Sequence, residues 1–168
     1  MATLPISQDQ DSIQLEIHIA APPERVFRAL TDPRQLLQRW GQKGMYRCTN
    51  WTTDVRAGGQ WRTEGVNDAD GKPFHVGGEY LELDPPRLLV CTWRASWSGP
   101  LQTVVRWELT PKPGGTRVRL YHSGFAQAPE QAQTHYQGWL HVTAWMQAFV
   151  EKGETLETRL AIATQPHG

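Results

Sequence analysis

Cysteine is scarce in this chain of 168 residues, which holds only Cys48 and Cys91. Neither belongs to a CxxC or Cys/His spacing, so the sequence gives no support to a disulfide framework or a metal site, and both thiols are expected to stay reduced. The first twelve residues lack an apolar stretch that resembles a secretory signal, and no run approaches the length of a membrane span. We therefore expect a cytoplasmic protein with no membrane span and no metal.

A surplus of charge is absent as well. The 17 Lys and Arg residues balance the 17 Asp and Glu residues, so the formal net charge is zero. Proteins that bind nucleic acids usually carry a basic surplus that neutralises phosphates. We expect no nucleic-acid partner.

Catalytic and cofactor motifs are also missing: the chain contains no GxSxG, HExxH, P-loop or GxGxxG context. No nucleophile is identified, and no cofactor is expected. His122 remains the one candidate for a catalytic acid or base. Glu64 and Glu79 lie on expected strands and are the acids that could pair with it.

Tryptophan, by contrast, is abundant, with eight copies. Each indole combines a large apolar area with one N–H donor. Two interpretations remain open at this point, a bulky core and a cavity lined by aromatic faces. Composition alone does not separate them.

The hydrophobic pattern changes along the chain. Alternation over residues 13–19 predicts a half-buried strand. Two short helical stripes follow, the first opened by Pro22 and Pro23 and the second capped by Asp32. Six more segments, each bounded by Gly or Pro, predict strands. These segments are residues 46–55, 60–66, 74–83, 88–96, 101–109 and 116–123.

Residues 130–151 contain no proline and repeat apolar side chains at helical spacing, which predicts one long helix that ends at Gly153. The order of elements predicts an α+β domain, in which a curved antiparallel sheet of about seven strands surrounds this C-terminal helix. We expect a flexible segment over residues 1–11, one domain over 12–153 and a tail over 154–168.

Five stretches, taken in order, resemble the START-like, helix-grip superfamily named SRPBCC. Residues 21–33 (APPERVFRALTDP) are similar to the entry of that superfamily. The other four are similar to its branch named after the activator of the 90 kDa heat-shock-protein ATPase. They are residues 56–61 (RAGGQW), 84–93 (DPPRLLVCTW), 115–125 (GTRVRLYHSGF) and the pair Gly138 and Trp139.

The resemblance implies a helix-grip fold with an apolar cavity but no particular activity, because the superfamily contains lipid carriers, hormone and pigment binders and polyketide cyclases. The eukaryotic co-chaperone of this branch carries a large additional N-terminal domain, for which this chain has no space, so chaperone activation is not expected. Many members have leucine where this chain has Thr143. Its hydroxyl is expected either to bond back to a helix carbonyl or to point into a cavity.

Period-2 alternation defines a provisional inner face. Val118, Leu120 and His122 share one parity on the last strand, against Arg117 and Arg119 on the other. On the helix, Trp139 is expected to anchor against the sheet and to line the cavity, while His135 and Tyr136 are expected to be exposed. The predicted cavity residues are Trp61, Thr63, Trp93, Val105, Trp107, Leu109, His122, Trp139, Thr143 and Met146.

Three functions remain open. The first is a binding module for a small apolar, lipid-like, polyketide-like or aromatic ligand. The second is an enzyme of the cyclase or dehydratase type that uses His122 in the same cavity. The third is a chaperone-related interaction module, which predicts an exposed apolar patch in place of a cavity.

Overall fold

The computed structural model describes residues 6–7 and 11–159. Most of the expected flexible N-terminal segment and the last nine residues of the expected tail lie outside this range. Where the tail is described, it packs against the domain: the Leu156 amide donates to the Gln38 carbonyl at 2.8 Å.

An eight-stranded sheet forms the body of the molecule, and every neighbouring pair of strands is antiparallel. The order is β1-β8-β7-β6-β5-β4-β3-β2, so only β1 leaves its sequence neighbours to pair with β8. The eighth strand is the two-residue β2. The strands are β1 (Ser12–Ile19), β2 (Gly41–Gln42), β3 (Tyr46–Thr53), β4 (Gln60–Asn67), β5 (Pro73–Asp84), β6 (Leu88–Ala95), β7 (Thr103–Lys112) and β8 (Gly115–Ser123).

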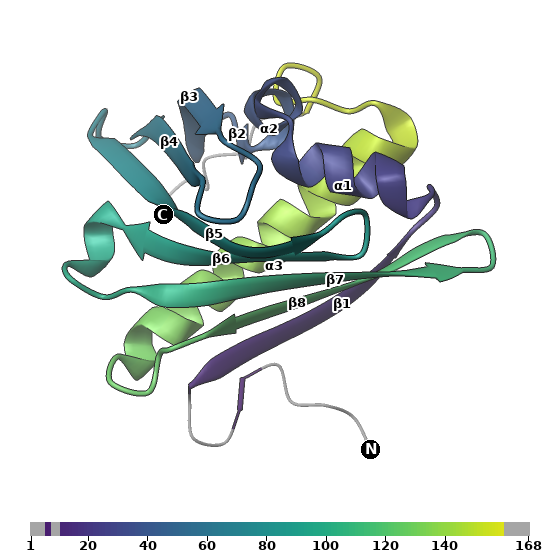
Figure 1. Cartoon of the computed structure of the whole chain (residues 1–168). Helices are drawn as coiled ribbons and strands as arrows, with labels where there is room; N and C mark the ends of the chain where they lie inside the picture. Colours follow the sequence, from purple (N-terminus) through teal and green to yellow (C-terminus); the bar gives the residue numbers. More distant parts are fainter. Residues whose placement is uncertain (1–5, 8–10, 160–168) are drawn as a thin grey trace.

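The long helix α3 (Pro129–Lys152) is continuous and crosses the concave face of the curled sheet (Figure 1). It begins at a proline, whose missing N–H costs nothing in the first turn, and ends at Gly153, which adopts the left-handed conformation with φ 71°. The predicted α+β helix-grip fold is confirmed.

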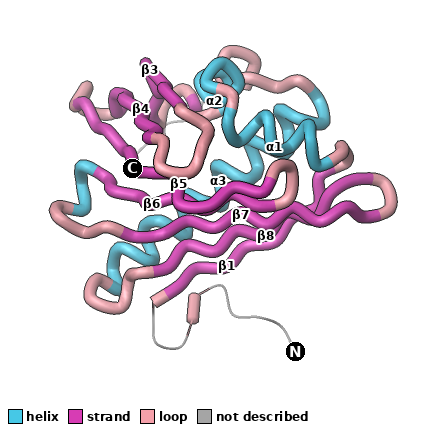
Figure 2. Tube along the Cα trace, viewed as in Figure 1, coloured by secondary structure: helices cyan, strands magenta, loops and turns pink. Residues whose placement is uncertain are grey.

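Two short helices, α1 (Pro23–Thr31) and α2 (Pro33–Arg39), follow β1 and contact α3 (Figure 2). They lie beside its C-terminal part, coloured yellow in Figure 1, where the Arg25 guanidinium is over the Phe149 ring. Asp32 separates them, and its carboxylate accepts the Arg34 amide at 2.9 Å, as an N-cap does. The 3-10 turn η1 (Ser96–Ser98) links β6 to β7 at the other end of α3.

The alternation predicted for β7 and β8 is confirmed: Val105, Trp107, Leu109, Val118 and Leu120 are all buried between the sheet and the helices. This inner face, together with the buried stripe of α3, forms one continuous apolar core.

Candidate ligand-binding site

A pocket of about 620 Å³, which we call the outer pocket, lies between the N-terminal half of α3 and strands β3 to β6. This volume is within the range of sites that hold a small organic molecule. Its walls are mainly apolar and aromatic, with a few polar groups. The lining residues are Trp40, Tyr46, Cys48, Thr63, Asn67, Lys72, Pro73, Phe74, Val76, Trp93, Ser96, Trp97, Thr134, His135, Gly138, Trp139 and Val142.

The rim of the outer pocket is aromatic. Trp97 in η1 is 48% exposed and stacks on His135, with ring centroids 5.9 Å apart. Its other neighbour is Phe74, whose ring meets it edge-on at 6.0 Å. An exposed indole held between two rings offers a flat apolar surface to a ligand that enters the pocket.

A second, much smaller space of about 40 Å³ lies deeper in the core, and we call it the inner void. It has room for a few water molecules or one small polar group. Its lining is apolar except for Arg39 and a few polar tips. The lining residues are Leu30, Leu36, Arg39, Trp40, Trp51, Trp61, Tyr80, Leu89, Cys91, Trp93, Val105, Trp107 and Trp139.

Three indoles border both spaces and separate them: Trp40, Trp93 and Trp139. The ring of Trp93 lies 5.1 Å from that of Trp139 and 6.4 Å from that of Trp40, while Trp40 meets Trp139 edge-on at 5.9 Å. Trp93 and Trp139 are buried, whereas Trp40 is half-buried and held by a 3.1 Å hydrogen bond from its indole N–H to the Tyr46 hydroxyl.

His122 is fully buried behind this partition, and both of its ring nitrogens are engaged. Its Nδ1 accepts the Trp139 indole N–H at 2.9 Å, which leaves the ring proton on Nε2, 2.6 Å from the Thr103 hydroxyl. The Thr103 hydroxyl in turn donates a hydrogen bond to the Trp93 carbonyl at 3.3 Å. Glu64 and Glu79 are exposed, and the two ring nitrogens of His122 are bonded to Thr103 and Trp139, so neither acid pairs with it.

His135 is buried and lines the outer pocket, so the expectation that it is exposed is wrong. Its Nδ1 donates to the Gln131 carbonyl at 2.8 Å, and its Nε2 accepts the Trp93 indole N–H at 3.2 Å. The residue is buried because the first turns of α3 are covered by β6 and η1, which a helical pattern alone does not reveal.

Burial keeps both histidines neutral. Loss of hydration lowers the pKa of His122 well below its usual range, and the nearby His135, 5.3 Å away between ring centroids, lowers it further. Burial also lowers the pKa of His135, against a smaller opposing effect of its hydrogen bond to Gln131. A neutral imidazole with both nitrogens already bonded has no free site for proton exchange with a ligand.

The ten predicted cavity residues fall into three groups. Thr63, Trp93 and Trp139 line the outer pocket, and the last two also border the inner void. Trp61, Val105 and Trp107 line the inner void only. The remaining four are buried but line neither space. They are Leu109, His122, Thr143 and Met146.

Thr143 uses its hydroxyl locally, because the Oγ1 donates to the Trp139 carbonyl at 2.7 Å. The first of its two expected roles, a bond back to the helix, is therefore the one observed. Several pocket residues escaped the sequence reasoning, among them Trp40, Tyr46, Phe74 and Trp97. Their aromatic character was visible, but they lie at the ends of elements, where alternation carries no information about the inner face.

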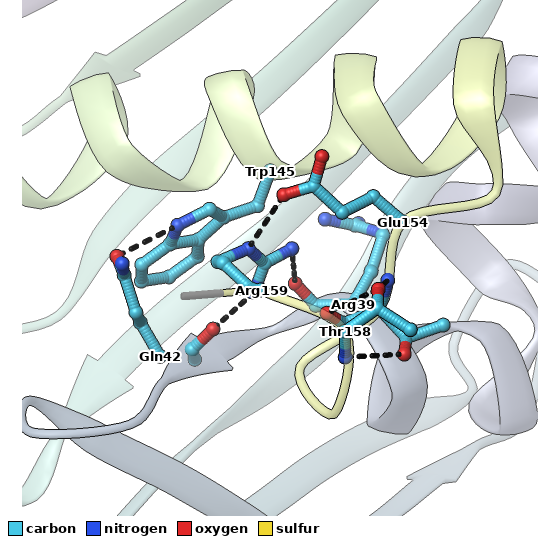
Figure 3. A network of polar contacts seen from close by, with 8 residues as sticks. Arg39, Gln42, Trp145, Glu154, Thr158 and Arg159 are labelled. Carbon is cyan, nitrogen blue, oxygen red and sulfur yellow. Dashed lines mark hydrogen bonds and ion pairs between the residues drawn. The ribbon is translucent and has the colours of Figure 1, made fainter. Parts of the chain in front are cut away.

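Two arginines, Arg39 and Arg159, are buried in the described structure. Arg39, the last residue of α2, is fully buried, and loss of hydration lowers its pKa to about 9. Arg159 stacks on the Trp145 ring, donates to the Gly41 and Arg39 carbonyls, and has Glu154 3.8 Å away (Figure 3). Burial likewise lowers the pKa of Arg159. Within the described ranges, no cluster of His, Cys, Asp or Glu could hold a metal ion.

A curled antiparallel sheet wrapped on a long C-terminal helix, with a pocket between them, defines a helix-grip protein. The family model described as "Activator of Hsp90 ATPase homolog 1-like protein" matches residues 20–151. The chain belongs to this family, as its sequence motifs predicted. No curated protein matches the chain. No helix among the described residues is long and apolar enough to cross a membrane.

Solved structures agree with this assignment. A protein from Chromobacterium violaceum is 32% identical with a TM-score of 0.74, and the match covers 84% of this chain and 97% of that one. A protein from Rhodobacter sphaeroides is 21% identical with a TM-score of 0.77, over 90% and 97% of the two chains. An AHSA1-like protein from Aeromonas hydrophila is 21% identical with a TM-score of 0.68, over 85% and 96%.

Proposed function

We propose that this protein binds a small apolar or aromatic molecule in the outer pocket. The observation that carries the proposal is a space of about 620 Å³ whose floor is formed by Trp93 and Trp139 and whose rim is formed by Phe74 and Trp97. Aromatic walls bury the body of a ligand, while a few polar groups such as Thr63 would fix its orientation. The helix-grip fold of the family is commonly used for ligand binding.

Binding is better supported than catalysis. An acid–base enzyme needs a titratable group within hydrogen-bond reach of its substrate and with a pKa near the working pH. His122 is separated from the outer pocket by the Trp93 and Trp139 rings and is bonded at both nitrogens. His135 reaches the pocket, but its nitrogens are occupied by Gln131 and Trp93.

The two free thiols, Cys48 and Cys91, are buried, which fits a reducing compartment, and we propose that the protein is cytoplasmic.

Gly138 offers a direct test, because it lines the outer pocket and a Cβ built there meets nothing within 4 Å. Gly138→Leu would add a side chain to the wall of the pocket, starting from a Cβ that contacts no neighbouring atom. Leucine also has a helix propensity about 0.8 kcal/mol better than glycine, so the fold should not be weakened. We expect the fluorescent probe N-phenyl-1-naphthylamine to bind the wild type and to lose about tenfold or more in affinity with Gly138→Leu.

Gln137→Leu is the matched control, because Gln137 is the preceding residue of α3 and is exposed. It adds a leucine to the same helix outside the pocket, so probe affinity should equal that of the wild type. Equal affinities for all three proteins, or no binding by the wild type, would contradict the proposed function. Circular dichroism and melting temperature report whether each variant keeps the fold.

A further inference from the structure

Arg39 has a hydrogen-bonding deficit that no other charged residue of the described chain has to the same degree. Its Nε donates to the Ala29 carbonyl at 2.8 Å, but Nη1 and Nη2 are both buried and have no partner. No described carboxylate lies within ion-pair distance of it. The residue is fully buried and lines the inner void.

This arrangement is unusual, because a buried charge is normally paired or hydrogen-bonded. The like-charged Arg159 acts electrostatically on Arg39 and lowers its pKa, while Glu154 forms an ion pair with Arg159. The Arg39 guanidinium also lies over the Trp40 ring, at 5.2 Å from its centroid, and that contact satisfies no N–H donor. Two unpaired terminal nitrogens on one planar fork match the two oxygens of a carboxylate.

The inner void suits such a group in size and surroundings. Its volume of about 40 Å³ accepts a small head group but excludes an aromatic body. The inner void and the outer pocket share Trp40, Trp93 and Trp139 in their walls, and Trp40, the half-buried member, is the residue that follows Arg39 in sequence. The Trp40 ring makes a single hydrogen bond, to Tyr46, beside its ring contacts with Trp93 and Trp139, and a displacement of this ring would join the two spaces.

We infer that Arg39 is the binding site for the acidic end of the ligand, a carboxylate, whose apolar or aromatic body occupies the outer pocket. This inference rests on the proposed function and adds the chemical class of the ligand, an amphiphilic organic acid. Trp40 is the positioning residue that admits the carboxylate to the inner void. The paired guanidinium and carboxylate then remove the buried, uncompensated charge of the free protein.

Two isosteric probes test the inference, 1-naphthaleneacetate and its neutral amide, 1-naphthaleneacetamide. Isothermal titration calorimetry on the wild type should give an affinity about tenfold or more higher for the acid, the effect expected of charge-assisted hydrogen bonds. Arg39→Met should abolish the preference by weakening the acid and leaving the amide unchanged. The variant should melt no lower than the wild type, because it removes an unpaired buried charge.

Lys72→Met is the matched control, because Lys72 is the exposed cation that lines the outer pocket. If Lys72→Met abolishes the acid preference and Arg39→Met keeps it, the inference is wrong. Equal affinities of acid and amide for the wild type overturn the Arg39 site but leave the proposed function standing. Binding of neither probe overturns both. The comparison of the two probes on the wild type holds even if a variant fails to fold.

Discussion

The two ends of the sheet differ in how they meet α3. At the end formed by β7, β8 and β1, inward side chains such as Val105, Leu120 and Ile13 are almost completely buried and pack without a large space. At the end formed by β3 to β6, equally apolar side chains border about 620 Å³ of pocket. The inward residues named at the closed end are aliphatic, whereas those at the open end are mainly aromatic with a few polar groups. Apolar character alone therefore does not determine whether a cavity forms between the sheet and the helix.

Trp93 and Trp107 show this contrast on the adjacent strands β6 and β7, where Trp93 pairs with Thr103 and Trp107 pairs with Leu89. The Trp107 ring meets the edge of Trp139 at 5.6 Å and borders only the inner void. The Trp93 ring touches Trp139 as well, but it also borders the outer pocket and binds His135 through its N–H. Trp139 therefore contacts residues at both ends of the sheet, Trp93 at the open end and Trp107 at the closed end.

The largest effect is expected from Trp139→Ala. It removes an indole in contact with Trp40, Trp93 and Trp107 and leaves the Nδ1 of His122 without its donor. We expect a loss of about 3–5 kcal/mol in the free energy of unfolding, measured by urea denaturation. Trp97→Ala at the exposed rim is the control and should cost far less. Similar losses of unfolding free energy for both variants would show that the contacts of Trp139 with the two ends of the sheet do not stabilise the fold.

Thr103→Val and Thr143→Val make the same chemical change at two buried positions, one on β7 and one on α3. The Thr103 hydroxyl is the partner of His122 Nε2, so its removal leaves a buried N–H unsatisfied, at a cost of about 1–3 kcal/mol. The Thr143 hydroxyl bonds only to carbonyls of its own helix, and its removal should cost less than about 1 kcal/mol. Urea denaturation of both variants measures the difference. Equal costs would argue against the hydrogen-bonded role of His122.

Acid should weaken the fold gradually. The pKa values of His122 and His135 are lowered in the folded protein from 6.5, so the unfolded chain binds protons first as the pH falls. Stability is therefore fully present above about pH 6.5 and declines below it, by at most about 1.4 kcal/mol per pH unit for each histidine. Urea titrations between pH 8 and 5 measure the slope, and His135→Gln should reduce it. A flat profile would show that neither histidine is held neutral.

Much of the candidate site could be read from the sequence, but unevenly. Alternation placed Trp93 and Thr63 on the inner face, and helical spacing placed Trp139 there. The same alternation placed Leu109 and His122 inward, yet both lie outside the two spaces. Parity tells which side of a sheet a residue faces, but it gives no distance to the element that covers that side. His135, Arg39 and Trp40 lie on helices or at a helix end, and they were missed because their burial depends on segments that are distant in sequence.

By itself, the sequence determined the elements and their order: the proline and Asp32 signals opened α1 and α2, Gly and Pro bounded the strands, and an uninterrupted apolar repeat made α3. These are local properties, since backbone preference and periodicity act within a few residues. Only the tertiary structure decided where α3 crosses the sheet, which leaves one end closed and the other open. It also decided that Arg39, the last residue of the short helix α2, is fully buried and that two nitrogens of its guanidinium have no partner. Burial depends on contacts between distant segments, and no local pattern encodes it.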